Sequence, residues 1–450
     1  MRKKRVQEFL FPILLTSMAL MLGLSMVNRN GNDIHEKLYN MEKSDTITAP
    51  IYIDDDDPLN DWDDCPYVSG AGTAGEPYII ANHTIDLASG NIGIRVHNSD
   101  KYLTIQNCTF NGLGLSSVSV GIYLYATFNV NITNCTIEYF DKGITISQSG
   151  MGTKYANYIS NCKIQDNEDY GIHISDAGDQ HVLENMISGS SYSGIFFESS
   201  TNNTIERNDI SGNVRGISIF DDNNSIISNN ISGNDWGVYV YFSQMNNLTN
   251  NSINNNDNLG VFLSYANQTT LNNNSLAGNG FLLHDCHEIE DDGANEVNNK
   301  PMVIYENQDG LVLSGVNDSG QVIFINSTNI EVQDFWLDNS AGLMFDNCNS
   351  LLLANVTLNV TCYDALTLYA CQDALIASSK LLDISGKAIN LDSAYSSNFT
   401  CYNNTINQTS GNAIYFQDHM VNCNITWNNI TNIMDRAIYV EEYADDLFMS

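Results

Sequence analysis

The sequence predicts an all-β protein, a right-handed parallel β-helix solenoid of about 14–15 coils, and three observations support this fold class. From Tyr78 onward the chain of 450 residues repeats at intervals of 21–28 residues, a period typical of solenoids. Each repeat contains a segment Gly-Φ-x-Φ, in which Φ is an apolar residue. This alternation with period two is that of a strand with one buried face, and no helical periodicity competes with it.

The Gly-Φ-x-Φ segment marks the start of a strand in successive coils. A strand of four residues cannot bury its apolar face alone, but stacked coils can, because each strand pairs with the coil above and below. We expect the crossovers to be right-handed, as parallel connections generally are. The first residues of these segments are Gly93, Gly121, Gly143, Gly171, Gly194, Gly216, Gly237, Gly260 and Gly342, followed by Ala365, Ala388, Ala413 and Ala437.

A second signature predicts an inward column at one corner of the coil. Its members are Cys108, Cys135, Cys162, Asn185, Asn208, Asn229, Asn251 and Asn274, each two residues before an apolar position. An Asn there can hydrogen-bond to its neighbours above and below, and a Cys there acts as a small buried hydrophobe. Because vertical neighbours lie about 4.8 Å apart, a disulfide between stacked Cys residues stays open. Cys348 and Cys371 should stack in the same way.

The chain divides into five segments on this reading. Residues 1–27 resemble an export signal, with basic residues at Arg2–Arg5 and an uncharged apolar run from Phe9 to Val27. A cleaved signal peptide is favoured over a retained anchor, because Gly23-Leu24-Ser25 offers small residues at cleavage spacing, although the apolar run is just long enough to span a bilayer. Residues 28–67 form a polar linker and N-terminal cap, 68–283 the first β-helix coils, 284–319 an insertion and 320–450 the second β-helix coils.

Charge and compartment narrow the partners. The formal net charge is −35, so a phosphate backbone would be repelled and nucleic acid is excluded as a partner. Asn-x-Ser/Thr sequons occur about twenty times, which suits an exported glycoprotein, although an Asn-rich repeat also generates sequons by chance. We expect a monomer that is secreted or on the cell surface or envelope, outside the cytoplasm. It would touch a membrane only through an uncleaved N-terminal segment.

Two stretches carry a family resemblance. One family is similar to this chain in both. Its first coil resembles the stretch from Ser69, SGAGTAGEPYIIANHTID. Its mid-helix insertion resembles the stretches NEVNNKPMVIYENQDG from Asn295 and GQVIFINSTNIEVQDF from Gly320. This family is the right-handed β-helix repeat proteins of the pectin-lyase-like fold, in particular the NosD-like, carbohydrate-binding-and-sugar-hydrolase (CASH) type. The resemblance covers nearly all of residues 68–450, with Asn299 where the family usually has Gly. It implies export and a sugar-binding or metal-accessory role, and it supplies no catalytic motif.

The x residue of Gly-Φ-x-Φ should point outward, and aromatic side chains are frequent there. A row of exposed aromatic rings on a strand face is unusual and suits stacking on a sugar polymer. A covering loop or a neighbouring molecule is the alternative explanation. The candidate substrate-binding residues are Tyr123, His173, Phe196, Tyr239 and Phe262.

Acidic residues follow the same strand on three consecutive coils, at Asp176, Glu198 and Asp221 with Asp222. With a rise of about 4.8 Å per coil, these carboxylates would suit either glycosidase geometry, so Asp176, Glu198 and Asp221 are candidate catalytic residues. Glu198, beside Phe196, is the expected proton donor, because a raised pKa requires a partly buried carboxyl. For lyase chemistry only Arg207 and Arg215 are close in sequence. Asp221 and Asp222 could instead hold Ca²⁺. No cofactor is required for the expected function, and Ca²⁺ is the one that these residues suggest.

A last cluster breaks the repeat at His284, Asp285, Cys286, His287 and Glu288. Soft and borderline ligands at such spacing could bind Cu or Zn, and in an extended segment only His284 and Cys286 would share a face. An ordinary insertion of the β-helix is the alternative.

The leading hypothesis is therefore an exported β-helix protein that binds polysaccharide along the Gly-Φ-x-Φ face without catalysis. The alternatives are a polysaccharide-cleaving hydrolase or lyase and a NosD-like copper or metal accessory protein.

Overall fold

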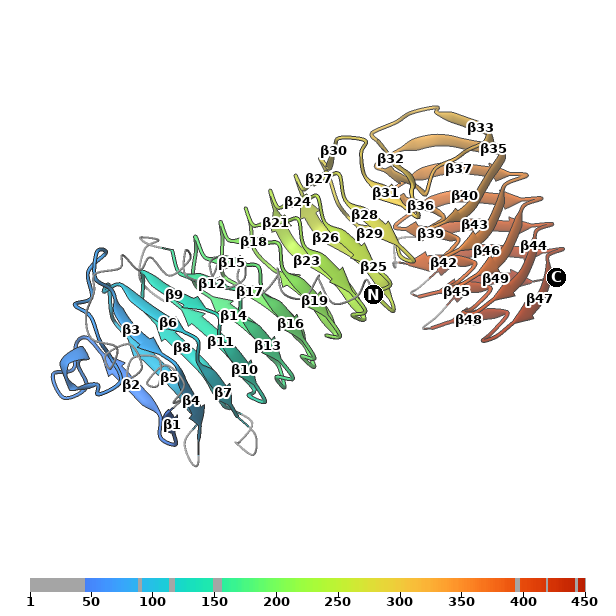
Figure 1. The fold of residues 1–450 in the computed structure, drawn as a ribbon. Coiled ribbons are helices and arrows are strands. Elements are labelled where there is room, and N and C mark those ends of the chain that lie inside the picture. Colours follow the sequence, from blue (N-terminus) through green and yellow to red (C-terminus); the bar gives the residue numbers. More distant parts are fainter. Residues whose placement is uncertain are drawn as a thin grey trace, which may run out of the picture. The chain divides into compact units, whose positions relative to one another are not determined.

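The computed structural model describes residues 45–87, 91–112, 118–148, 156–392, 397–417, 420–441 and 444–449, and the expected export signal lies outside them. The described residues are almost entirely β-strand, with one short 3-10 helix, η1 (Trp62–Asp64). No helix that they form has the length and apolarity needed to cross a membrane. The predicted fold class is confirmed: parallel strands stack coil upon coil into a β-helix (Figure 1).

Sheet 1 is ten-stranded and carries the Gly-Φ-x-Φ segments of the first coils. Its strands, in order, are β2 (Ile51–Asp54), β5 (Ile92–His97), β8 (Val120–Tyr125), β11 (Lys142–Ser147), β14 (Tyr170–Ser175), β17 (Ser193–Glu198), β20 (Arg215–Ile219), β23 (Trp236–Gln244), β26 (Leu259–Asn267) and β29 (Phe281–His284).

Sheet 2 is also ten-stranded and follows the first corner of each coil. It comprises β3 (Tyr78–Ala81), β6 (Leu103–Gln106), β9 (Val130–Thr133), β12 (Tyr158–Ser160), β15 (His181–Leu183), β18 (Thr204–Glu206), β21 (Ser225–Ile227), β24 (Asn247–Thr249), β27 (Thr270–Asn272) and β30 (Glu290–Asp291).

Sheet 3 completes these coils and continues into the second stretch through the antiparallel pair β31–β32. Its first strands are β1 (Asp45–Ile47), β4 (His83–Asp86), β7 (Thr109–Asn111), β10 (Thr136–Glu138), β13 (Lys163–Gln165), β16 (Met186–Ser188), β19 (Asp209–Ser211), β22 (Asn230–Ser232), β25 (Ser252–Asn254), β28 (Ser275–Ala277) and β31 (Glu296–Val297). Beyond the hairpin come β32 (Lys300–Glu306), β34 (Gln321–Ile325), β36 (Leu343–Asp346), β39 (Leu366–Tyr369), β42 (Ile389–Asp392), β45 (Ile414–Phe416) and β48 (Ile438–Val440).

Sheet 4 belongs to the second stretch, and its long strand β35 pairs with both β37 and β38. Its strands are β33 (Val312–Val316), β35 (Thr328–Ser340), β37 (Asn349–Ala354), β38 (Thr357–Thr361), β40 (Gln372–Ala377), β41 (Lys380–Ile384), β43 (Ser397–Tyr402), β44 (Thr405–Thr409), β46 (Met420–Thr426), β47 (Asn429–Ile433) and β49 (Ala444–Met449).

Parallel pairing begins before residue 68, where the sequence places the first coil. Strand β2 pairs with β5, so that Ile51 lies opposite Ile94 and Ile53 opposite Val96. Ile51 and Ile53 alternate into the core, as the period-two rule requires. The segment expected to be a polar linker therefore includes two strands, β1 and β2.

The predicted inward column is confirmed. Cys108, Cys135 and Cys162 are at most 2% exposed, and the backbone N–H of Cys162 donates to Oδ1 of Asn185 at 2.9 Å. The Asn side chains below continue this ladder, since Asn208 Nδ2 donates to Asn229 Oδ1 at 3.0 Å. No disulfide joins the stacked thiols of Cys108, Cys135 and Cys162.

The glycine of Gly-Φ-x-Φ is explained by a close approach between coils. A Cβ built on Gly216 would lie 2.5 Å from the carbonyl oxygen of Gly237, inside any real contact distance. Equivalent glycines up and down the column meet the same obstacle. The column therefore aligns sheet 1 so that its outward side chains lie in straight rows across the coils.

Candidate functional site

The outer face of sheet 1, meaning its outward-pointing side chains, forms three parallel rows. The central row holds the x residues of Gly-Φ-x-Φ, which face one another across the coils in the register Tyr123–Thr145–His173–Phe196–Ser218–Tyr239–Phe262. The leading row holds the residue before each glycine, in the register Lys142–Tyr170–Ser193–Arg215–Trp236. The trailing row follows two residues after the central one and includes Ser175, Glu198, Tyr241 and His284.

Aromatic rings of the three rows make a continuous ladder. Tyr170 stacks on Phe196 at 4.9 Å between ring centroids, and Phe196 meets Phe220 edge-on at 5.4 Å. Tyr239 and Phe262 follow, 5.0 Å apart, and Phe262 meets His284 at 5.1 Å. Such pairs add roughly 0.5–1.5 kcal/mol each beyond the area they bury.

The expectation of exposed rings is wrong for three of the candidate substrate-binding residues. Phe196, Phe262 and His173 are only 8–9% exposed, and Tyr123 and Tyr239 are half-buried. The physical reason is that rings of neighbouring rows cover them. Tyr170, Tyr192 and Phe220 pack on Phe196, while Trp236 packs on Phe262.

The open ring surface lies instead at the margins of the ladder. The side chain of Tyr192 is 40% exposed and Phe242 59% exposed. Phe242 stacks on Tyr265 of the next coil, with centroids 4.5 Å apart and planes 6° from parallel. These rings present flat apolar surface to solvent beside hydroxyl groups, the combination on which a sugar ring can stack.

The acidic residues do occupy three consecutive coils, as expected, but their burial differs from the expectation. Glu198 and Asp176 are exposed, whereas Asp221 is half-buried and its Oδ2 has no hydrogen-bond partner. Burial raises the pKa of Asp221, and the charges of Asp222 and Glu198 act in the same direction. Asp221, rather than Glu198, is therefore the carboxyl suited to hold a proton.

His173 connects the acids to the aromatic ladder. Its Nε2 lies 3.4 Å from Oε2 of Glu198, and its ring stacks between Tyr170 and Phe196. Burial lowers the pKa of His173, the charge of Lys142 adds to this effect, and Glu198 opposes it. A neutral imidazole beside an exposed carboxylate can accept a proton, which is the chemistry that a catalytic reading of this site requires.

Asp176 and Asp222 lie at the edge of this group. Asp176 occupies a corner with φ of 51°, and among the described residues no hydrogen bond or ion pair joins its side chain to the other acids. Oδ1 of Asp222 accepts the backbone N–H of Gln244 at 2.7 Å. The described residues contain no group of three or more His, Cys, Asp or Glu that could hold a metal ion, and Asp221 with Asp222 alone would be a sparse set of ligands for Ca²⁺.

His284 and Cys286 do not converge on one point. His284 lies on the outer face and its ring stacks on Tyr369, whereas Cys286 is fully buried in the core. The thiol of Cys286 donates to the carbonyl oxygens of Leu263 and His284 at 3.4 and 3.5 Å. The left-handed residue Asp285 between them, with φ of 53°, turns the chain and sends the two side chains to different sides.

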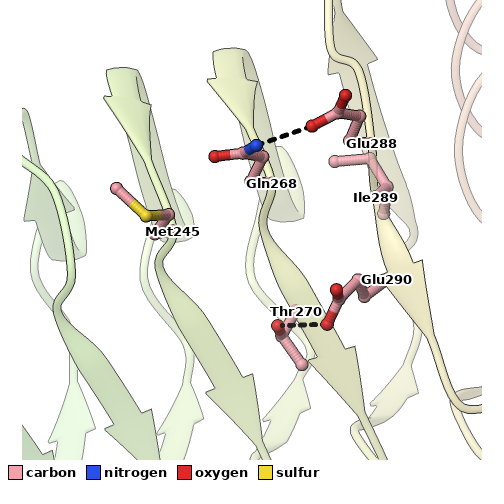
Figure 2. A pocket seen from close by; sticks show the side chains of 6 residues that line it. All are labelled: Met245, Gln268, Thr270, Glu288, Ile289 and Glu290. Atoms are coloured by element: carbon pink, nitrogen blue, oxygen red, sulfur yellow. Dashed lines mark hydrogen bonds between the residues drawn. The ribbon is translucent and has the colours of Figure 1, made fainter.

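A hollow of about 580 Å³ lies away from the outer face, beside the turns that lead into sheet 2 (Figure 2). Its two acids are already engaged, because Glu288 accepts from Gln268 at 2.6 Å and Glu290 from Thr270 at 3.2 Å. The hollow is open and holds no aromatic ring. The outer face of sheet 1 is therefore the better candidate site.

Three residues of this face, Lys142, Tyr170 and Tyr192, escaped the sequence analysis, which considered Arg215 only for lyase chemistry. Their signal was present, since Lys142, Tyr170 and Arg215 directly precede the glycine of their coils and Tyr192 lies one residue further back. Strict period-two alternation would point the residue before the glycine into the core. The strand pairing skips the glycine itself, and this irregularity places the side chain before it on the outer face.

Comparison with known proteins gives a family and several distant structural likenesses. The model of the family described as periplasmic copper-binding protein (NosD) matches residues 69–240 and 188–308. No curated protein gives a significant match to the chain.

Solved structures with a similar fold include the Dettilon tailspike protein gp208, 14% identical over 72% of this chain and 60% of that chain, with a TM-score of 0.41. The A-module of the Azotobacter vinelandii mannuronan C-5 epimerase AlgE4 is 12% identical over 81% of this chain and 92% of its own, with a TM-score of 0.37. The periplasmic alginate epimerase AlgG is 12% identical over 91% and 89%, with a TM-score of 0.29. The chain thus spans less than two thirds of the tailspike's length.

Proposed function

Because the chain belongs to the NosD family of periplasmic proteins, we propose that it acts outside the cytoplasm and binds polysaccharide along the outer face of sheet 1. The observation that carries this proposal is the aromatic ladder with its margin at the exposed rings of Tyr192 and Phe242 and the half-buried ring of Tyr265. Coils repeat about every 4.8 Å, so the face offers regularly spaced rings to an extended polymer. Binding without catalysis is the preferred form, because the face is open and nothing among the described residues closes over the acids to exclude water.

The family description also implies copper. Copper sites draw on converging His, Cys or Met ligands. The described residues offer no cluster of three His, Cys, Asp or Glu side chains, and Cys286 points into the core while His284 stacks on Tyr369. These residues do not fit a copper site, and copper has no part in the proposed function.

Affinity electrophoresis against a panel of soluble polysaccharides tests the proposal. Tyr192→Ala and Phe242→Ala each remove an exposed ring and should weaken binding about fivefold, since a stacked ring contributes on the order of 1 kcal/mol. Tyr158→Ala is the matched control, because Tyr158 is 42% exposed but belongs to sheet 2. A wild-type protein that binds no polymer, or a control that loses as much affinity as the two variants, contradicts the proposal.

A second candidate function, polysaccharide cleavage, is favoured by one observation. His173, whose pKa burial lowers, contacts Glu198, and the charge of Glu198 reaches the half-buried Asp221, whose pKa burial raises. An acid and a base at fixed separation are the minimum for glycoside hydrolysis. Arg207 is not available for lyase chemistry, because it pairs with Glu184 and Glu206, whereas Arg215 lies on the outer face.

A further inference from the structure

Basic side chains on the outer face of sheet 1 lie over tyrosine rings. The guanidinium of Arg215 lies 4.2 Å from the ring centroid of Tyr239 and 5.0 Å from that of Tyr192. Nζ of Lys142 lies 5.5 Å from the centroid of Tyr170, and Arg95 lies between Tyr52 and Tyr123. Arg215 donates one N–H to the hydroxyl of Tyr192 at 3.2 Å and Arg95 donates its Nε–H to Nε2 of His97 at 2.5 Å. A ring face attracts a cation but leaves its other N–H groups able to donate to an anion.

These cations have no carboxylate partner, although the chain has 53 acidic and only 18 basic residues. Lys and Arg form ion pairs elsewhere in the described chain, at Lys101, Arg207, Lys300 and Arg436, but Lys142, Arg215 and Arg95 form none. On so acidic a protein, a carboxylate beside each cation would be the default. Because these three cations of the outer face form no ion pair, they are available to bind an anionic ligand.

A second, independent observation points to a ligand at the same place. Oγ1 of Thr145 and Nδ1 of His173 are buried and make no hydrogen bond, while Nε2 of His173 faces Oε2 of Glu198 at 3.4 Å. Thr145 and His173 are neighbours in the central row, and the charge of Lys142 reaches His173. Buried polar groups are normally paired, because leaving one unpaired costs free energy. Polar groups of a bound molecule could satisfy them.

The same arrangement recurs in the second stretch of coils. Lys387 precedes the Ala of its coil, and its Nζ lies 3.8 Å from the ring centroid of Tyr415. Arg436 holds the equivalent place two coils later, with its guanidinium 4.1 Å from the centroid of Tyr439, although it also pairs with Asp435. A cation before the strand thus lies repeatedly on a tyrosine at the x position of its own coil or of the next one, which argues against a single chance contact.

We propose that the polymer bound by the outer face is an anionic polysaccharide, whose carboxylate or sulfate groups are bound by Lys142 and Arg215 while its sugar rings lie on the neighbouring tyrosines. This inference rests on the proposed function and adds the chemical class of the ligand. Lys142 and Arg215 are three coils apart, about 14 Å at the usual coil rise, so they contact separate sugar units.

Dissociation constants measured by isothermal titration test this with three probes: polygalacturonate, dextran sulfate and neutral dextran. We expect the wild-type protein to bind at least one anionic polymer about tenfold tighter than dextran. Arg215→Gln and Lys142→Gln should each weaken that binding about tenfold, and Arg215→Lys should restore most of it, because it returns the charge. A preference for polygalacturonate over dextran sulfate, or the reverse, identifies carboxylate or sulfate as the group recognised.

Two matched controls carry the same chemical changes away from the face. Arg207→Gln and Lys163→Gln remove a cation from exposed positions outside sheet 1 and should leave binding unchanged. Equal binding of dextran and the charged polymers, or no effect of Arg215→Gln on folded protein, overturns the inference but leaves polysaccharide binding intact. Absence of binding to all three probes and to the wider neutral panel overturns the proposed function itself.

Discussion

The imidazole of His284 stacks on the phenol ring of Tyr369, with centroids 4.1 Å apart and planes 10° from parallel. His284 ends β29, the last strand of sheet 1, whereas Tyr369 ends β39 of the second stretch. Asp346, in β36, adds to this contact, because its carboxylate oxygens accept the backbone N–H groups of Asp285 and Cys286 at 3.0 and 3.1 Å. The outward side chains of β36 and β39 therefore cover the last coil of the first stretch and leave it no bare edge.

Asp346 should make this junction sensitive to pH. Burial raises the pKa of its fully buried carboxyl to about 7, from 3.8. A carboxyl whose pKa is higher in the folded state stabilises it fully below pH 4, and this contribution is lost as the pH rises to about 7. Between pH 4 and pH 7 we expect the free energy of unfolding of the wild type to fall by about 4 kcal/mol more than that of Asp346→Asn, as measured by urea unfolding. Asp334→Asn changes an exposed acid and should keep the wild-type dependence of stability on pH. The same dependence for Asp346→Asn as for the wild type would contradict the prediction.

The asparagine ladder should be sensitive to a single deletion. Oδ1 of Asn229 accepts from the backbone and side chain of Asn208, and its Nδ2 donates to the carbonyl of Ile205 at 2.9 Å. Asn229→Ala leaves these buried groups unpaired and should lower the free energy of unfolding by about 3 kcal/mol. The adjacent Asn230→Ala, at an exposed position, should cost less than about 0.5 kcal/mol in the same chemical denaturation experiment. Equal losses would mean that the ladder adds little.

Rings at the centre and margin of the outer face should separate stability from binding. Phe262→Ala removes a ring that is only 8% exposed and should lower the free energy of unfolding by about 3 kcal/mol. Tyr192→Ala removes a ring that is 40% exposed and should change stability by less than about 1 kcal/mol while weakening polysaccharide binding. Thermal unfolding beside affinity electrophoresis measures both effects. The reverse assignment would place the binding surface at the centre of the face.

The acids distinguish a binding protein from an enzyme. If the chain only binds, Glu198→Gln leaves affinity within about twofold, because Glu198 is exposed and lies in the trailing row. If it cleaves the polymer, the loss of the carboxylate beside His173 abolishes turnover without loss of binding. We expect the first result in assays of reducing ends and of unsaturated products. Product formed by the wild type and absent with Glu198→Gln would establish catalysis.

The repeat made the coils predictable, because Gly-Φ-x-Φ and the Cys–Asn column are both local patterns with a fixed period. The first coil was missed where that period is broken. Between β2 and β3 the chain forms a long loop in which Trp62 stacks on Tyr78, so Ile51 and Ile53 are not followed by the expected second signature.

Ring burial on the outer face could not be predicted in this way. Alternation gives the direction of a side chain but not what covers it, and Phe196 is covered by Tyr170, Tyr192 and Phe220 from three different coils. The burial of Asp221 and the exposure of Glu198 depend on the same packing across coils. The convergence of Lys142 and Arg215 on one row depends on the irregular step at each glycine, which a strict period-two reading reverses.

The glycine column has an evolutionary consequence. Since it stacks every coil on the next in one register, the distance between Lys142 and Arg215 changes only in whole steps of one coil, about 4.8 Å each. Duplicating or deleting a single coil between them would move the two cations relative to each other by one step and leave the coils on either side of that segment unchanged. Such a protein can change the spacing of anionic groups that it recognises by gaining or losing whole coils.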